Sequence, residues 1–209
     1  MISNRLLLSI SGLCLFLAAG KMDLIFCADG KNPMEQREEE LKAFREKRDR
    51  FFKDDPQSPL KEKERKRFKG LIYYPIDLKY AAVGKIDRYP TEPKSLYITL
   101  STAKGPERRY VKYGRFDFKL EGKKYTLHLY RPPGGSEFFL PFKDKTSETE
   151  THREGRYLHI EAMPDGTVLI DFNRAYNPSC EFDERYTCPL PPPENWLDVA
   201  IRAGEKRFR

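Results

Sequence analysis

Apolar and polar residues alternate along much of the chain between Tyr80 and Phe172, and this alternation constrains the fold more than any other feature. Successive side chains of a β-strand point to opposite faces, so a period of two gathers the apolar residues on one face of a sheet. The alternation is clearest at residues 115–120 and 124–130, which Glu121-Gly122 separates in the manner of a hairpin turn. We therefore expect antiparallel strands with one buried face.

The same pattern predicts strands over most of the central part of the chain. We expect them at residues 80–88, 97–100, 109–113, 115–120, 124–130, 137–142, 156–161 and 167–172. Pro164-Asp165-Gly166 should form the turn between the last two, because proline and glycine favour the dihedral angles of tight turns. About eight short strands at close spacing predict a mainly β fold, an antiparallel sandwich or barrel.

One amphipathic, charged helix should precede the strands. Residues 35–55 are rich in Glu, Lys and Arg, and Leu41, Phe44 and Phe51 recur at helical spacing. The helix should end before Pro56, because proline disfavours helical geometry in the residue before it. Since 209 residues suit one domain, we expect a helix at 35–55 that docks its phenylalanines on a β domain at 68–206, with a basic linker at 56–67.

Positive charge exceeds negative charge but is mixed with it. The chain has 39 Lys and Arg residues and 32 Asp and Glu residues, which gives a net charge of +7. Its densest basic run, residues 61–67, contains Glu62 and Glu64. Proteins that bind nucleic acids concentrate positive charge so that many phosphates are neutralised together. We therefore expect no nucleic-acid partner, and we interpret the run as a solvated face or linker rather than a contact with a polyanion or anionic lipid.

The first residues of the chain have the pattern of an export signal peptide. Arg5 is followed by apolar or small residues from 6 to 20, a stretch shorter than the ~20 apolar residues that cross a bilayer as a helix. Ala18-Ala19-Gly20 favours a signal peptide at 1–20, and cleavage as late as residue 28 is the alternative. The protein is therefore expected to be exported, periplasmic or extracellular. A lipid anchor at Cys27 is the other possibility, and the membrane is a partner only in that case.

Cys180 and Cys188 lie eight positions apart in a proline-rich segment. An exported protein meets an oxidising compartment, and a short loop can bring two α-carbons within the roughly 4.4–6.8 Å that a disulfide requires. We predict a disulfide between them, with a metal pair and a nucleophilic cysteine as alternatives. Because His128, His152 and His159 lack the spacing of metal ligands, we expect no metal and no cofactor.

Several segments between residues 68 and 206 carry a family resemblance. They lie at 68–71, 142–147, 150–158, 171–180, 188–197 and 201–206, and include Asp-Phe-Asn followed by Tyr-Asn-Pro, and Pro-Leu-Pro-Pro followed by Glu-Asn. In this order they resemble the uncharacterised bacterial and archaeal proteins of domain-of-unknown-function family 1684. The chain departs from the family pattern where Glu148 replaces a glycine and His152 replaces an aromatic residue. The resemblance supports the domain at 68–206 and implies no reaction, because the family has no established activity.

Polar and aromatic residues in the same segments form the candidate ligand-binding site. They fall in loops or at strand ends, which can converge at one rim of a sandwich or barrel. In the functional interpretation, the carboxylates bind a ligand or supply a general base, and Arg156 holds an anionic group. In the structural interpretation, Arg156 pairs with Asp144 or Asp171 and the asparagines satisfy turn backbone. The candidates are Asp144, Glu150, Arg156, Tyr157, Asp171, Asn173, Tyr176 and Asn177.

Two neighbouring segments have interpretations of their own. Oxygen-bearing side chains occupy every second position in one of them, as in a calcium loop, although the glycine of an EF-hand is absent. These residues are Asp144, Thr146, Glu148 and Glu150. Residues 189–193 should form a polyproline strap over an open sheet edge, held by Cys188 and anchored by Trp196.

No catalytic signature accompanies these residues. The chain has no glycine-rich phosphate loop, no Gly-x-Ser-x-Gly and no His-Glu-x-x-His, which argues against an enzyme without deciding the question. We expect a noncatalytic ligand-binding or structural module of the bacterial cell envelope, with a small polar ligand or another envelope component as its partner. The alternative is a hydrolase that uses the carboxylates of Asp144, Glu150 and Asp171.

Overall fold

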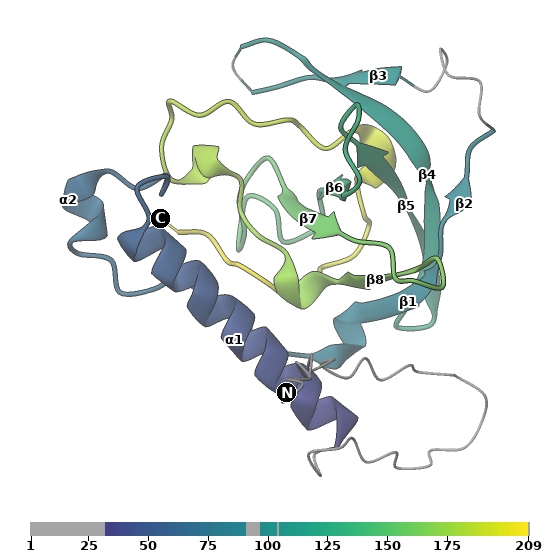
Figure 1. The fold of residues 1–209 in the computed structure, drawn as a ribbon, viewed down its shortest axis with the longest axis horizontal. Helices are drawn as coiled ribbons and strands as arrows, with labels where there is room; N and C mark the ends of the chain where they lie inside the picture. Colours follow the sequence, from purple (N-terminus) through teal and green to yellow (C-terminus); the bar gives the residue numbers. More distant parts are fainter. Residues whose placement is uncertain (1–31, 91–96, 104, 209) are drawn as a thin grey trace, which may run out of the picture.

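The computed structural model describes residues 32–90, 97–103 and 105–208. The predicted export signal, its later cleavage site and Cys27 lie outside these residues. Eight strands in the described part form two antiparallel sheets, and one long helix runs along the side of the β body (Figure 1). The predicted mainly β fold class is confirmed, and its arrangement is sandwich-like.

The strands lie close to the predicted positions. The larger sheet has six strands in the order β2-β4-β5-β6-β7, with β3 also paired to β4, and the smaller sheet pairs β1 with β8. The predicted turn at residues 164–166 is present, and it connects strands of different sheets. The strands are β1 (Ala81–Lys85), β2 (Asp87–Arg88), β3 (Tyr97–Leu100), β4 (Arg108–Leu120), β5 (Lys123–Arg131), β6 (Phe138–Phe142), β7 (Arg156–Ile160) and β8 (Thr167–Asp171).

β4 merges two segments that the sequence predicted separately. Its register against β5 shifts between Lys112 and Gly114, which marks a β-bulge. A Cβ at Gly114 would lie 2.5 Å from the backbone oxygen of Asp87 in β2, so glycine is required where these two strands approach. The predicted hairpin turn between β4 and β5 forms at Glu121 and Gly122, whose φ angles are 51° and 79°.

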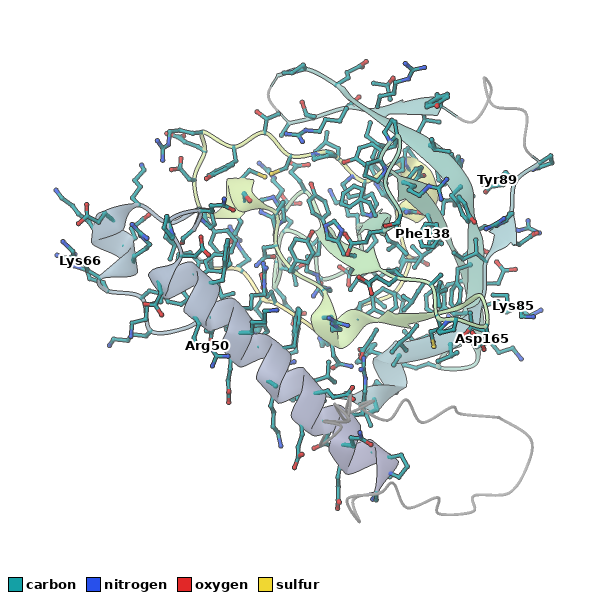
Figure 2. All side chains as sticks on the ribbon, in the orientation of Figure 1. Arg50, Lys66, Lys85, Tyr89, Phe138 and Asp165 are labelled. Atoms are coloured by element: carbon teal, nitrogen blue, oxygen red, sulfur yellow. The ribbon has the colours of Figure 1, made fainter. Side chains whose placement is uncertain are left out.

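The two sheets share one hydrophobic core. Phe116 of β4 and Leu127 of β5 contribute buried side chains from the larger sheet, and Ile170 of β8 contributes one from the smaller sheet. Ile201 joins the same core from the C-terminal segment, residues 201–206. Phe138 of β6 also lies within the β body (Figure 2). Each such burial stabilises the fold by about 1.5–3 kcal/mol, so the alternating pattern is the main source of its stability.

α1 (Pro33–Asp54) docks on the β body through one face, while Arg50 points away from the body (Figure 2). Leu41 and Phe52 are buried, whereas Phe44 and Phe51 are only half-buried. The predicted helix is therefore present, but its buried stripe is shifted relative to the prediction. None of the helices in the described part of the chain is long and apolar enough to span a membrane.

Residues 56–67, which the sequence suggested as a linker, pack against α1. They contain the short helix α2 (Glu62–Arg65) and a buried leucine, Leu60. Leu60 shares a small apolar cluster with Phe52, Leu71 and Phe182. This cluster attaches the C-terminal end of α1 to the β body.

The proline-rich strap is held by the predicted Trp196, whose Nε1 donates to the oxygen of Pro191 at 3.0 Å, and also by Asn195. Trp196 is 57% exposed, so it does not bury the strap. Asn195, in the 3-10 helix η4 (Pro193–Asn195), is fully buried. Its side chain accepts from the N–H of His128 at 2.8 Å and donates to the oxygens of His128 and Pro141 at 2.9 and 2.8 Å. An amide can bridge β5 and β6 in this way because it both donates and accepts, whereas an indole only donates.

Candidate functional site

Arg156, the first residue of β7, is fully buried beneath the C-terminal segment. Its Nη2 donates to the backbone oxygen of Ile201 at 2.8 Å, and its Nη1 donates to those of Ala203 and Glu205 at 2.5 and 3.1 Å. A guanidinium presents several donors in a fixed plane, so it can hold successive carbonyl groups of an extended chain. Arg156 therefore fastens residues 201–205 to the larger sheet.

Asp144 completes this buried attachment. Its Oδ2 accepts from the N–H of Ile201 at 2.6 Å and from Arg156 Nη2 at 3.3 Å, and its Oδ1 accepts from the Thr146 hydroxyl at 2.8 Å. The Arg156 and Asp144 side chains are 0% and 1% exposed. Burial lowers the pKa of Arg156, and the charge of Asp144 opposes that shift. This is the ion pair of the structural interpretation, and protein donors occupy the oxygens that a calcium ion would need.

Asp171, the last residue of β8, joins the β body to α1. Its Oδ2 accepts from Arg37 Nη2 at 2.6 Å, and its Oδ1 accepts from the backbone and side-chain N–H groups of Asn173, each at 2.9 Å. The Asn173 side chain accepts from the N–H of Asp77 at 3.0 Å and donates to its oxygen at 2.9 Å. The structure thus brings together two predicted residues, Asp171 and Asn173, but uses them to connect α1, β8 and the segment before β1.

Glu205 is a buried carboxylate outside the set of site residues predicted from the sequence. Its Oε2 accepts from the N–H of Asn177 at 2.8 Å, and its Oε1 accepts from Arg48 Nε of α1. Arg48 also makes a cation–π contact, with its Cζ 4.6 Å from the centroid of the Tyr176 ring. Asn177 donates to the oxygen of Lys206 at 2.7 Å. Two further predicted residues, Tyr176 and Asn177, therefore lie where α1 meets the C-terminal segment.

The arginines of α1 were missed although the sequence carries a signal for them. Arg37 and Arg48 are eleven positions apart, about three helical turns, so they share one face of the helix. That face is the one that docks, and a charged group placed there needs a partner. Their partners are Asp171 and Glu205.

Glu150 lies nearer the surface and pairs with a third arginine. Its carboxylate accepts from Arg202 Nη2 and from the Tyr74 hydroxyl, each at 3.0 Å. The hydrogen bond from Arg202 is the main cause that lowers the pKa of Glu150. Burial, together with the hydrogen bond to Glu150, raises the pKa of Tyr74 to about 12. The three predicted carboxylates, on Asp144, Asp171 and Glu150, thus bind three different arginines instead of facing one ligand position.

Tyr157 and Tyr176 form an aromatic pair at the start of β7. Their ring centroids are 5.8 Å apart and their planes cross at 88°, an edge-to-face contact. The Tyr157 hydroxyl donates to the oxygen of Pro189 at 2.5 Å, and burial raises the pKa of both phenols. Tyr157 therefore ties the proline-rich strap to the larger sheet.

Cys180 and Cys188 are adjacent free thiols in this structure. Cys180 lies in the 3-10 helix η3 (Ser179–Glu181), and its backbone N–H donates to Cys188 Sγ at 3.2 Å. His152 Nε2 is 3.8 Å from Cys180 Sγ, and His152 Nδ1 is 2.6 Å from Glu181 Oε2. The disulfide remains a prediction for these two sulfurs. Among the described residues, no group of three His, Cys, Asp or Glu side chains is placed to hold a metal ion.

The two thiols differ in acidity. The hydrogen bond from the Cys180 thiol, followed by the Cys180 backbone N–H, lowers the pKa of Cys188 to about 7 despite its burial. The same thiol hydrogen bond, together with burial, raises the pKa of Cys180. Cys188 is therefore the more readily ionised sulfur of the pair. The thiolate is the nucleophilic form of cysteine.

An open groove of about 370 Å³ lies between α2 and the end of the described chain. Two aromatic rings form its apolar part, and three cationic side chains and one carboxylate line the rest. The sequence predicts a solvated face for this basic run, and the structure adds that the face is concave. The lining residues are Lys63, Glu64, Arg67, Phe68, Lys69, Gly70 and Phe208.

Residues 66–206 match the family model described as a protein of unknown function, DUF1684. The chain belongs to this family. The solution NMR structure of the uncharacterised protein from gene locus rrnAC0354 of Haloarcula marismortui is similar over 83% of this chain and 95% of that chain, with 34% sequence identity and a TM-score of 0.63. No curated protein matches the chain.

Both departures from the DUF1684 pattern lie in the connection between β6 and β7. Glu148 has a φ of 77°, in the left-handed region that glycine adopts without strain, which explains the glycine of the family pattern. His152 is buried beside Cys180 and Glu181, where the pattern has an aromatic residue. In this DUF1684 protein, the second replacement places a titratable ring next to the thiols.

Proposed function

We propose that the chain is a noncatalytic module of the bacterial cell envelope, exported and with a ligand-binding or structural role. The supporting observation is that each of the three candidate carboxylates forms an ion pair with an arginine of the same chain. A general acid or base must come within hydrogen-bonding distance of the substrate proton. The side chains of Asp144 and Asp171 are each 1% exposed, so neither can approach a substrate while these contacts are intact.

A carboxylate-dependent hydrolase is the weaker alternative. It would depend on Glu150, whose side chain is 32% exposed. The hydrogen bond from Arg202 lowers the pKa of Glu150, which keeps it ionised at neutral pH and makes it a poorer base. Glu150 would therefore have to act without a second carboxylate, because Asp144 and Asp171 are buried in other contacts. Its hydrogen bond with Arg202 also weakens it as a base.

The groove between α2 and Phe208 supports a ligand-binding role. Its excess of cationic groups favours an anionic ligand, and its aromatic rings add apolar contact area. A phosphate-bearing component of the cell envelope has the complementary charge. The export part of the proposal rests on Arg5 and the apolar stretch at 6–20, and a lipid anchor at Cys27 is its variant.

Hydrolysis assays test the noncatalytic role. Wild-type protein and Glu150→Gln are compared with p-nitrophenyl acetate, p-nitrophenyl phosphate and p-nitrophenyl β-glucoside as probes, after circular dichroism has confirmed that the variant is folded. We expect the release of p-nitrophenol to be equal in the two proteins and no faster than with buffer. Turnover by the wild-type protein that a folded Glu150→Gln variant has lost would establish the hydrolase instead.

Calorimetric titration with tripolyphosphate tests the groove. We expect binding by the wild-type protein and at least a tenfold weaker affinity when Lys63→Glu and Arg67→Glu are combined, on the order of 1.4 kcal/mol. The matched control combines Lys47→Glu and Lys53→Glu on the exposed side of α1, which changes the net charge equally. Equal weakening in both proteins would mean that net charge, and not the groove, binds the probe.

A further inference from the structure

The thiols of Cys180 and Cys188 are placed so that one is accessible and the other is sheltered. Cys180 is half-buried and Cys188 is buried, and the N–H of Cys180 donates to Cys188 Sγ at 3.2 Å. An external sulfur compound therefore reaches Cys180 first, with Cys188 directly behind it. Redox-sensitive cysteines have this arrangement, an accessible sulfur next to a second cysteine that can resolve it.

Glu181 fixes the orientation of His152. Its Oε1 accepts from the N–H of Phe208 at 2.8 Å, and its Oε2 is 2.6 Å from His152 Nδ1. A carboxylate accepts hydrogen bonds, so a neutral His152 carries its proton on Nδ1 and presents a lone pair on Nε2. That lone pair faces Cys180 Sγ at 3.8 Å, within reach of the thiol proton. Orienting carboxylate, base and thiol thus stand in the order that activates a nucleophile.

The two other histidines have different surroundings. His128 Nδ1 is 2.5 Å from the hydroxyl of Tyr89, and His159 Nδ1 is 2.8 Å from a carboxylate oxygen of Glu137. His159 is also stacked on Tyr176 and is 45% exposed. Of the three histidines, His152 is therefore the one whose ring nitrogen lies beside the Cys180 thiol.

We propose that Cys180 and Cys188 form a redox-responsive pair, in which Cys180 attacks a low-molecular-weight disulfide, His152 accepts its proton and Cys188 resolves the mixed disulfide. The reaction modifies the chain itself and needs no turnover, so it is compatible with a noncatalytic module and does not depend on that role. Its product is the Cys180–Cys188 disulfide, which would hold the proline-rich strap to η3.

The first step moves one proton and exchanges one bond. The Cys180 thiol, whose hydrogen bond to Cys188 raises its pKa, turns from Cys188 to His152 Nε2 and gives this nitrogen its proton as its sulfur attacks the disulfide R–S–S–R. A Cys180–S–S–R bond forms, the original S–S bond breaks, and the leaving thiolate takes the proton from His152 to become R–SH.

The second step is intramolecular. The Cys188 thiolate attacks the sulfur of Cys180, forms the Cys180–Cys188 bond and displaces the second R–S⁻, which takes up the proton that Cys188 gave to solvent. Two cysteines have then lost two electrons and two protons, and R–S–S–R has become two molecules of R–SH. The lowered pKa of Cys188 supports this step, because it provides a thiolate at neutral pH.

Peptide mass spectrometry of the full chain follows each intermediate separately. Cleavage after Arg174, Arg185 and Arg202 places Cys180 in peptide 175–185 and Cys188 in peptide 186–202. Reduced protein is treated with glutathione disulfide, quenched with acid at successive times and digested without reduction. We expect glutathione to appear first on peptide 175–185, and then to be replaced by a disulfide that links the two peptides.

Three variants separate the roles of the residues. In Cys188→Ser, glutathione should accumulate on Cys180. His152→Phe, which introduces the aromatic residue of the family pattern, should slow the first step at least about tenfold because the general base is lost. The matched control is His159→Phe, because His159 lies on the same strand as Tyr157 but contacts Glu137. This variant should react at the wild-type rate.

Several outcomes would overturn the proposal. They are a first adduct on Cys188, thiols that do not react in the folded chain, and equal rates in His152→Phe and the wild-type protein. Should His152→Phe fail to fold, Glu181→Gln takes its place, because it keeps an acceptor for the N–H of Phe208 while weakening the orientation of His152. The order of modification in the wild-type protein tests the proposal without any variant.

Discussion

The C-terminal attachment and the thiol pair are both built from ionisable side chains, but their partners differ. In the attachment, which comprises Arg156, Asp144 and Glu205 with residues 201–206, charged groups are buried against opposite charges and backbone carbonyl groups. In the thiol pair, half-buried Cys180 faces a histidine lone pair and solvent. Residue type alone therefore does not mark a reactive site. A reactive site is marked by an accessible atom that lies next to a free lone pair, as Cys180 lies next to His152 Nε2.

The attachment is broken most severely by Arg156→Ala. This change leaves the Asp144 carboxylate buried without its ion-pair partner, which costs about 3–5 kcal/mol of the free energy of unfolding. Urea unfolding followed by circular dichroism measures the loss. Arg202→Ala removes the more exposed pair with Glu150 and should cost at most about 1 kcal/mol, so equal losses in the two variants would contradict the distinction between them.

Oxidation of the thiol pair should have the next largest effect. A disulfide that closes the loop from Cys180 to Cys188 restricts the unfolded chain and should stabilise the fold by about 2.5 kcal/mol. The free energy of unfolding is compared between the oxidised and reduced protein. The free energy of unfolding of Cys188→Ser should not rise with the oxidant, because this variant cannot form the Cys180–Cys188 bond. An oxidised wild-type protein no more stable than the reduced one would count against two sulfurs placed to form a disulfide.

Glu150 should give the smallest effect, and it depends on pH. Its pKa in the folded protein lies below the ordinary value of 4.5, mainly because of the hydrogen bond from Arg202. The pair therefore stabilises the protein above that pH, and the stabilisation is lost as the pH falls through the lowered pKa. Relative to Glu150→Gln, the wild-type protein should be more stable by at most about 1 kcal/mol at neutral pH. An advantage that grows on acidification would show that the pKa is shifted the other way.

Local patterns predicted most of the fold. The alternation in β4 and β5 follows from the geometry of a strand, and Glu121-Gly122 fixes the register of the hairpin because two residues with positive φ suit its twist. The alternation breaks at Gly114, so the sequence predicts two strands where β4 is one continuous strand with a bulge. The approach of Asp87, which makes that glycine necessary, is a contact with a strand distant in the sequence.

The partners in the candidate site could not be predicted in the same way. Arg37 and Asp171 are separated by 134 positions, and the Cys180 and His152 side chains meet across 28. No local periodicity encodes such pairs, because they depend on how α1 and the β6–β7 connection dock. The sequence therefore identified Asp171 and Cys180 as chemically notable, and only the fold shows that the first is neutralised and the second is not.

Carboxyl footprinting tests most directly whether the candidate carboxylates are internal attachments. The native chain is labelled with a carbodiimide and glycine ethyl ester, and the rate at each residue is read by peptide mass spectrometry, with Asp198, whose side chain is 90% exposed, as the reference. Asp144, Asp171 and Glu205 should stay unlabelled until the chain unfolds, and Glu150 should react at an intermediate rate. Labelling of Asp144 or Asp171 as fast as Asp198 in the native protein would show an open carboxylate site and contradict their role as attachments.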